Sequence, residues 1–447
     1  MKKKFFLLFS SVFLFFSCGT DFLERENVSP VLSAGLLDKN RKWTVLVYMA
    51  ADNNLESEAI TDLNEMEVSA LDANVTVLAL VDRAQGFDAT NGDWTDTRLY
   101  KIIQDNQVNK TLIASERLDC PELGLSASES SELDMSNPST LSGFLSYARR
   151  KFPAENFALI LWGHGTGWRN SESEIISENN VFSSKAFAID NSSYMTISAL
   201  RRGIEAGMGD EKLSVIGFDT CFGICLETAY ELCDSADFMI GTPGLVASGG
   251  WNYSNVFARF SKSDFSQKSF LETVLSQFRE EYASYPHAVF SCLDLSRIRK
   301  LVEGLSFCAK DFADSIDCQE KRDQIFTIFR EKTLSYYATS YPTDFYVDLR
   351  HLIGQLSDFY DFSDLSSLIE DAVYDSWSSF EESVSMGLFF TVYSNPGVES
   401  PSHPAGYYAD SKSTETGRFV RDCSGYVPSG RKNYSLLDKL FYSEFDE

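Results

Sequence analysis

The chain has 447 residues, of which 44% are hydrophobic and 23% are charged, a composition typical of a globular protein rather than a disordered one. Its 39 Lys and Arg are outnumbered by 65 Asp and Glu, giving a formal net charge of −26. This acidity argues against nucleic acid, or an anionic lipid surface bound through basic side chains, as a partner. Four histidines argue against a multi-histidine metal site, and no HExxH, GxSxG, P-loop or GxGxxG segment occurs.

The first 17 residues have the pattern of an export signal. A basic start, Lys2–Lys4, precedes an apolar run from Phe5 to Phe16, which is shorter than the roughly 20 residues of a membrane-spanning helix. Ser17-Cys18-Gly19 resembles the cleavage site of a bacterial lipoprotein, which implies that Cys18 is acylated, for example with palmitate. The alternative is an ordinary signal peptide in which Cys18 is incidental.

A lipid on Cys18 would attach the mature chain to a membrane through a polar tether, residues 18–42. Because no Asp follows Cys18 directly, we expect an exported bacterial lipoprotein anchored in the outer membrane. The sequence does not specify whether the protein faces the periplasm or the cell surface.

Apolar runs alternate with amphipathic stretches between residues 43 and 260. Five apolar runs predict buried strands: Thr44–Ala50, Val75–Val81, Phe157–Trp162, Leu213–Phe218 and Ala236–Gly241. Helical spacing occurs in the stretches 55–71, 140–150, 196–207 and 221–233. Polar segments at 119–136 and 169–185 predict loops. Strands that are apolar throughout and alternate with helices predict an α/β fold, with a mainly parallel sheet flanked by helices.

Beyond residue 260 the alternation continues less regularly. Apolar runs favour strands at 288–295, 346–349 and 386–393, and helical spacing favours helices at 264–284, 297–314 and 364–380. We therefore place a soft boundary near residue 260. Residues 261–447 are expected to form a C-terminal α+β extension, to which the sequence assigns no chemistry of its own.

Two predicted strands end in loops with reactive side chains. One continues into Leu161–Trp168 (LWGHGTGW) and the other into Gly217–Gly223 (GFDTCFG). The carboxyl ends of parallel strands lie at one edge of a sheet, so His164 and Cys221 can meet there. We expect Cys221 to begin the following helix, where the macrodipole would lower the thiol pKa. His164 could then activate the thiol and protonate a leaving amine.

Each of these residues also has an ordinary structural explanation. A single Cys after a strand usually packs in the core, and a His between glycines can be a turn residue. The order and spacing of His164 and Cys221, each after a buried strand, favour a Cys–His dyad over two unrelated residues.

Four separated segments, in order, resemble the clostripain family of cysteine peptidases. They are Trp43–Glu56 (WTVLVYMAADNNLE), Leu159–Trp168 (LILWGHGTGW), Phe218–Leu232 (FDTCFGICLETAYEL) and Trp251–Tyr253 (WNY). A weaker similarity at Gly387–Tyr393 extends towards the C-terminus.

The resemblance implies a caspase-like α/β fold and hydrolysis of peptide bonds through a Cys–His dyad. Together with the leader, this predicts a lipid-anchored cysteine endopeptidase. Cys221 would be the nucleophile and His164 the general acid and base, with the main-chain amides of Gly165 and Cys221 as oxyanion donors. The family favours Arg or Lys before the scissile bond, and Asp219 matches a position in its specificity pocket. A helix N-cap before Cys221 is the alternative role for Asp219.

One segment departs from the family pattern. Residues 241–250 (GTPGLVASGG) lack the glutamates that family members often carry, which weakens the expectation of Arg or Lys specificity. A peptidase with another specificity and a non-catalytic surface lipoprotein that binds peptide or protein therefore stay open. Several family members cut themselves between the His and Cys motifs, and Arg169 and Lys185 are the candidate positions here.

No metal site and no required cofactor are expected. Some family members respond to calcium, but scattered carboxylates such as Asp190 do not define a site in the sequence. Eight cysteines besides Cys18 are too widely spread for a dense disulfide framework. Cys225 and Cys233 are expected to be buried thiols. The oligomeric state stays open.

Overall fold

The computed structural model of the chain describes residues 41–105, 111–167, 187–190, 193–328, 332–336, 344–380 and 384–391. The expected signal, Cys18 and nearly all of the tether lie outside the described residues, as do Arg169 and Lys185. Among the described residues, no helix has both the length and the apolar character needed to cross a membrane.

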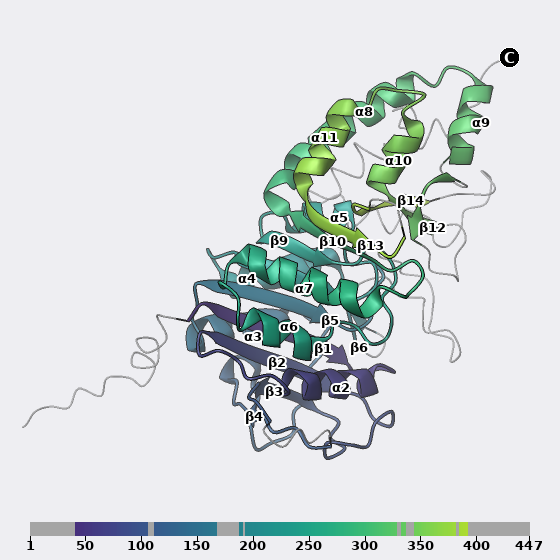
Figure 1. The fold of residues 1–447 in the computed structure, drawn as a ribbon. Coiled ribbons are helices and arrows are strands. Elements are labelled where there is room, and N and C mark those ends of the chain that lie inside the picture. Colours follow the sequence, from purple (N-terminus) through teal and green to yellow (C-terminus); the bar gives the residue numbers. More distant parts are fainter. Residues whose placement is uncertain are drawn as a thin grey trace, which may run out of the picture.

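The centre of the fold is a nine-stranded sheet in the order β13-β10-β9-β8-β5-β1-β2-β3-β4 (Figure 1). The five strands expected from the apolar runs form its parallel centre, while its two margins are antiparallel. The predicted mainly parallel sheet is thus confirmed. The strands are β1 (Trp43–Ala51), β2 (Val75–Arg83), β3 (Thr97–Lys101), β4 (Glu116–Arg117), β5 (Asn156–Trp162), β8 (Leu213–Asp219), β9 (Ala236–Gly241), β10 (Val289–Asp294) and β13 (Val373–Ser378).

Helices cover both faces of this sheet (Figure 1). On β1, Leu46 and Tyr48 face one core with α3, α4 and α5, while Val45 and Val47 face the other with α2, α6 and α7. The helices are α2 (Glu56–Met66), α3 (Pro138–Lys151), α4 (Ile197–Met208), α5 (Leu226–Leu232), α6 (Tyr253–Phe260), α7 (Gln267–Tyr282), α8 (Ile298–Asp314), α9 (Gln319–Thr327), α10 (Leu349–Leu356) and α11 (Ser363–Ala372), with short 3-10 turns at Pro121–Leu123 and Leu295–Arg297.

Two smaller sheets accompany the central one. One pairs β6 (Phe187–Asp190) with β7 (Ser193–Met195). The other has the order β11-β12-β14, from β11 (Ser335–Tyr336), β12 (Asp344–Asp348) and β14 (Gly387–Thr391). In Figure 1 this second sheet lies near α10, beyond the β9–β10 side of the main sheet.

The main sheet extends past the boundary expected near residue 260. The strand predicted at 288–295 is β10, and it pairs antiparallel with β9. The helix predicted at 364–380 is wrong in its second half, because α11 ends at Ala372 and the chain continues as β13. Trp377 of β13 lies edge-on to Phe278, so an aromatic contact with α7 favours the strand over a longer helix.

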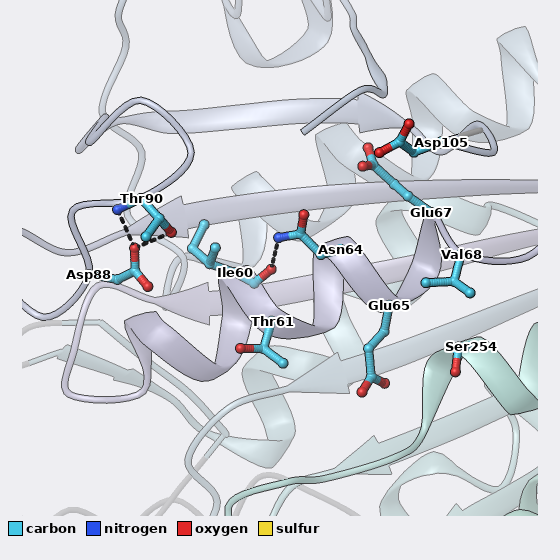
Figure 2. A pocket seen from close by; sticks show the side chains of 10 residues that line it. All are labelled: Ile60, Thr61, Asn64, Glu65, Glu67, Val68, Asp88, Thr90, Asp105 and Ser254. Atoms are coloured by element: carbon cyan, nitrogen blue, oxygen red, sulfur yellow. Dashed lines mark hydrogen bonds between the residues drawn. The ribbon is translucent and has the colours of Figure 1, made fainter. Parts of the chain in front are cut away.

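A surface pocket of about 320 Å³ lies beside α2 (Figure 2). Two of its carboxylates are already bound to the protein: Glu67 accepts hydrogen bonds from two main-chain amides, and Glu65 accepts one from the Tyr253 amide. The lining residues are Ile60, Thr61, Asn64, Glu65, Glu67, Val68, Asp88, Thr90, Asp105 and Ser254. Neither His164 nor Cys221 is among them.

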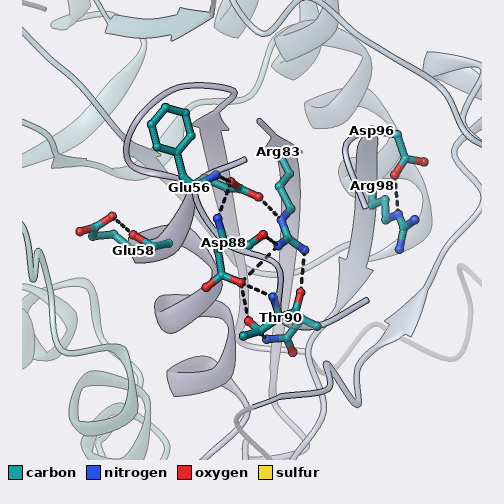
Figure 3. Close-up of polar contacts among 10 residues, drawn as sticks. Glu56, Glu58, Arg83, Asp88, Thr90, Asp96 and Arg98 are labelled. Carbon is teal, nitrogen blue, oxygen red and sulfur yellow. Dashed lines mark hydrogen bonds and ion pairs between the residues drawn. The ribbon is translucent and has the colours of Figure 1, made fainter. Parts of the chain in front are cut away.

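A buried ion pair fixes the start of α2 against the end of β2 (Figure 3). The side chains of Glu56 and Arg83 are both fully buried, and Arg83 Nε donates to Glu56 Oε1. Glu56 Oε2 accepts the main-chain amides of Phe87 and Asp88, each at 2.9 Å, and Arg83 Nη1 donates to Thr90 O at 3.1 Å. These bonds satisfy both charges and hold the turn after β2.

Replacement of Glu56 by Ala should lower the free energy of unfolding by about 3–5 kcal/mol, because it leaves the Arg83 charge buried without its partner. Arg259 and Glu280 form a matched control, since their side chains are 48% and 59% exposed. Arg259→Ala should cost about 1 kcal/mol or less. Denaturant unfolding of both variants measures the difference, and equal losses would contradict a structural role for the buried pair.

Candidate active site

His164 lies two residues beyond the end of β5. Gly163 makes the turn with a φ of +128°, and a Cβ there would lie 2.9 Å from Ala50 O, so the position requires glycine. The Gly163 amide donates to Asp219 O at 3.3 Å. His164 Nε2 lies 2.9 Å from Asn54 Oδ1, in the loop after β1. Three adjacent strands, β1, β5 and β8, therefore contribute to the surroundings of the imidazole.

Cys221 lies two residues beyond the end of β8. Trp162 and Asp219 are paired across β5 and β8, so the two loops leave the sheet at the same level. Their backbones are in close contact, since a Cβ on Gly165 would lie 2.5 Å from Cys221 O. The structure therefore brings the loops of His164 and Cys221 together at the carboxyl edge of the sheet.

Cys221 does not begin a helix, in contrast to the sequence prediction. The helix α5 begins only at Leu226. The preceding residues instead bond to the chain after β9, through Phe222 N to Gly244 O at 2.8 Å and Ile224 N to Thr242 O at 3.0 Å. Extended pairing with this segment delays the helix, so the N-terminus of α5 does not lie at the thiol.

The surroundings of Cys221 favour the neutral thiol over the thiolate. Burial raises its pKa, and the negative charge of Asp219 adds to this effect. The Val246 amide donates to Sγ at 3.3 Å and acts in the opposite direction. The sequence predicted a lowered pKa for this thiol, and this prediction is wrong because the surroundings in the structure raise it.

The His164 imidazole is also biased towards its neutral form. Burial lowers its pKa, and the charge of Glu58 opposes this only in part. With the amide oxygen of Asn54 as acceptor, Nε2 carries the hydrogen, which leaves Nδ1 as the basic nitrogen. Asn54 thereby selects the tautomer that can accept a proton.

Asp219 is a buried carboxylate with one oxygen in use. Its side chain is 5% exposed, and Oδ2 accepts the Trp251 amide at 3.1 Å and the Tyr253 hydroxyl at 2.9 Å. No described residue forms a hydrogen bond to Oδ1, and a Cβ on Gly250 would lie 2.9 Å from it. Burial raises the pKa of Asp219 to about 7, and Glu65 adds to the shift. The alternative role as a helix cap is wrong, because the helix begins seven residues later, at Leu226.

Asp62 is a second buried acid on the same side of the sheet. It accepts a hydrogen bond from Trp162 Nε1 at 2.6 Å, and burial together with the Asp219 charge raises its pKa well above the usual range. Sequence reasoning missed Asp62 and Asn54. A polar residue at the apolar spacing of α2 was the available signal for Asp62, and the Asp52-Asn53-Asn54 run after β1 was the signal for Asn54.

The C-terminal part of the chain closes the other side of the two loops. The Tyr346 hydroxyl donates to Thr166 O at 3.2 Å, and its ring stacks on Phe222 at 5.5 Å. The Gly387 amide donates to Ile224 O at 3.0 Å. Residues after 260 thus help to hold the loops that carry His164 and Cys221. Cys225 and Cys233 are buried thiols, as predicted.

Comparison with known proteins gives one family and several related folds. The clostripain family matches residues 47–399. Clostripain of Hathewaya histolytica is 30% identical over 249 residues, which are 52% of this chain and 45% of that protein, so the match spans less than half of the relative.

Two solved structures have a similar fold. One is an inactive zymogen of a C11 protease from Parabacteroides distasonis, with a TM-score of 0.57 and 18% identity over 86% of this chain and 99% of that chain. The other is a secreted C11 cysteine protease from Bacteroides thetaiotaomicron in complex with an irreversible peptide inhibitor, with a TM-score of 0.58 and 18% identity over 86% of this chain and 100% of that chain. At this identity the likeness concerns the fold, and it agrees with the expected caspase-like architecture.

Alkylation of Cys221 should report the neutral state of the thiol. In the protein without substrate, the pH at half-maximal iodoacetamide labelling should lie above the ordinary thiol pKa of about 8.5. Asp219→Asn should lower this midpoint, because it removes a negative charge that opposes the thiolate. Mass spectrometry of the Cys221 peptide measures the labelling. A midpoint below pH 7 would indicate a thiolate–imidazolium pair and contradict this account.

Proposed function

Because the chain belongs to the clostripain family of cysteine peptidases, we propose that it is an endopeptidase with Cys221 as nucleophile and His164 as general base and acid. The observation that carries the proposal is the close contact between the two loops. The Gly163 amide donates to Asp219 O, and the backbone of Gly165 packs against Cys221 O. This contact supports a shared reaction centre for a thiol and a neutral imidazole.

The proposed reaction begins with both groups neutral. As the substrate binds, the Cys221 proton passes to His164 Nδ1 and Sγ attacks the peptide carbonyl carbon. The amides of Gly165 and Cys221 would donate to the resulting oxyanion. His164 then protonates the leaving amine, and a thioester remains. Water attacks the thioester with His164 as base, which releases the acid and restores the thiol. No metal or cofactor is needed for these steps.

We propose that the substrate residue before the scissile bond is Arg or Lys. Asp219 supports this, because its buried Oδ1 receives no hydrogen bond from the described residues and a cationic side chain would supply one. Glu65 adds negative charge near the same place. The segment 241–250 contains no further acid, and it contributes only the backbone of Gly250, which packs against the Asp219 carboxylate.

We further propose that Cys18 carries the lipid that anchors the chain at the outer membrane. The support is the leader sequence, with its basic start, apolar run and Ser17-Cys18-Gly19 junction. Two or more acyl chains would give a stable anchor, whereas one chain gives only marginal attachment. A lipid-anchored peptidase would act on peptides or proteins that reach that membrane.

Cleavage of a mixed peptide library tests the peptidase directly. The unmodified chain should cut after Arg or Lys, and Cys221→Ala should abolish all cuts. Circular dichroism should show that the variant keeps its fold. Limited trypsin treatment of both proteins mimics activation by cleavage. Cuts that persist in the Ala variant would exclude Cys221 as nucleophile. No cuts by either protein would favour a non-catalytic peptide-binding lipoprotein, and cysteine-dependent cuts after other residues would reject the basic pocket.

The pH dependence of kcat/KM tests the role of Asp219. This ratio reports groups of the free enzyme, and the raised pKa of about 7 means that the carboxyl loses its charge as the pH falls through 7. For an Arg substrate, kcat/KM should therefore fall about tenfold per pH unit below 7. Asp219→Asn should lower kcat/KM by about 10- to 150-fold and remove this limb.

A substrate with citrulline in place of Arg is the matched control. It lacks the positive charge, so only the titration of His164, whose pKa is lowered by burial, should limit its cleavage at acid pH. Identical acid limbs for the two substrates would contradict a charge interaction between Asp219 and the substrate.

A further inference from the structure

The Asp219 carboxylate is held by the start of α6 and the residues just before it. Its Oδ2 accepts two hydrogen bonds, from the Trp251 amide at 3.1 Å and from the Tyr253 hydroxyl at 2.9 Å. No described residue forms a hydrogen bond to Oδ1. Two donors on one oxygen fix the rotation of the carboxyl group. They thereby determine which oxygen is presented to a ligand.

Tyr253 is itself fixed on several sides. The residue is fully buried, and its amide donates to Glu65 Oε2 at 3.1 Å. Its ring packs against Trp251 and Phe257, with centroids 6.4 Å and 5.8 Å away. Burial raises the pKa of the phenol well above its usual range, and the Asp219 charge adds to this effect. The hydroxyl therefore keeps its proton and is a fixed donor to the carboxylate.

Glu65 acts on Asp219 in the opposite direction to Tyr253. Burial raises the pKa of Asp219 to about 7, and the hydrogen bonds from Trp251 and Tyr253 lower it. The negative charge of Glu65, which projects from α2 (Figure 2), raises it. The titratable groups that interact with Asp219 come from α2, α6, α7 and its own loop, and they are Asp62, Glu65, Tyr253, Tyr282 and Cys221. None of these groups is a base, so a ligand has to supply the positive charge.

We propose that Tyr253 is a positioning residue for the pocket that recognises Arg or Lys. Its hydroxyl and the Trp251 amide hold Asp219 so that Oδ1 meets the cationic side chain. Glu65 disfavours the negative charge of Asp219 and so sets the pH below which recognition is lost. This role rests on the proposed recognition of a basic residue, and Tyr253 acts on the substrate only through Asp219.

Peptide binding to the full chain carrying Cys221→Ala tests this role without any cleavage. Calorimetry over a range of pH compares a peptide that contains one Arg with the same peptide containing citrulline. The affinity for the Arg peptide should fall as the pH drops through about 7, because Asp219 loses its charge. The affinity for the citrulline peptide should lack this fall.

Two variants in the same background should move the midpoint of that fall in opposite directions. Tyr253→Phe should weaken binding of the Arg peptide about 3- to 10-fold at neutral pH. It should also move the midpoint to higher pH, because it removes a hydrogen bond that favours the carboxylate. Glu65→Gln should move the midpoint to lower pH, because it removes a negative charge and keeps an oxygen for the Tyr253 amide. A general loss of structure cannot produce two opposite shifts.

Tyr336→Phe is the matched control. The Tyr336 hydroxyl also donates to a buried carboxylate, Asp348 Oδ2, at 3.1 Å. The variant therefore loses the same kind of hydrogen bond as Tyr253→Phe, at a place away from Asp219. It should lose a similar amount of stability and keep the midpoint for the Arg peptide.

An unchanged midpoint in Tyr253→Phe, or shifts of both variants in the same direction, would overturn the proposal. Absence of binding of the Arg peptide, before and after limited trypsin treatment, would also overturn it. With Cys221 intact, kcat/KM for an Arg substrate should show the same opposite shifts. The expected shifts in binding with no cleavage would leave the role of Tyr253 standing and reject the peptidase. Cysteine-dependent cleavage without those shifts would do the reverse.

Discussion

The pairing of Trp162 with Asp219 across β5 and β8 is the constraint on which the candidate active site depends. It fixes the level at which two parallel strands end, so that His164 and Cys221 each follow two residues later. A register shift of one residue would move each side chain of β8 to the opposite face of the sheet, and Asp219 would leave its buried position. The close approach of Gly165 to Cys221 depends on this register, whereas that of Gly163 to Ala50 depends on the pairing of β5 with β1.

Burial then sets the chemical state of the site. It raises the pKa values of Cys221 and Asp219 and lowers that of His164, so each group is biased towards its neutral form. In the proposed reaction, a substrate that brings a positive side chain would restore the Asp219 charge, and proton transfer from the thiol would accompany attack. On this proposal, the thiolate and the imidazolium form only once a substrate is bound. Tyr346, from the C-terminal part, closes the same loops.

The sequence predicted the parallel strands because continuous apolar runs specify burial on both faces, and strand ends then placed His164 and Cys221 at one edge. It failed where long-range contacts decide the local structure. Pairing with residues 242–246 delays the helix after Cys221, and packing on Phe278 turns 373–378 into a strand. Arg169, Lys185 and Cys18 stay predictions outside the described residues.

A crystal structure of the chain treated with a peptidyl ketone inhibitor, with Lys as the residue next to the reactive group, tests the central claim most directly. We expect a covalent bond to Cys221 Sγ, with the Lys ammonium within hydrogen-bond distance of Asp219 Oδ1. The former carbonyl oxygen should face the Gly165 amide, and His164 should keep its contact with Asn54. An inhibitor bonded to another cysteine, or a Lys side chain directed away from Asp219, would contradict the account.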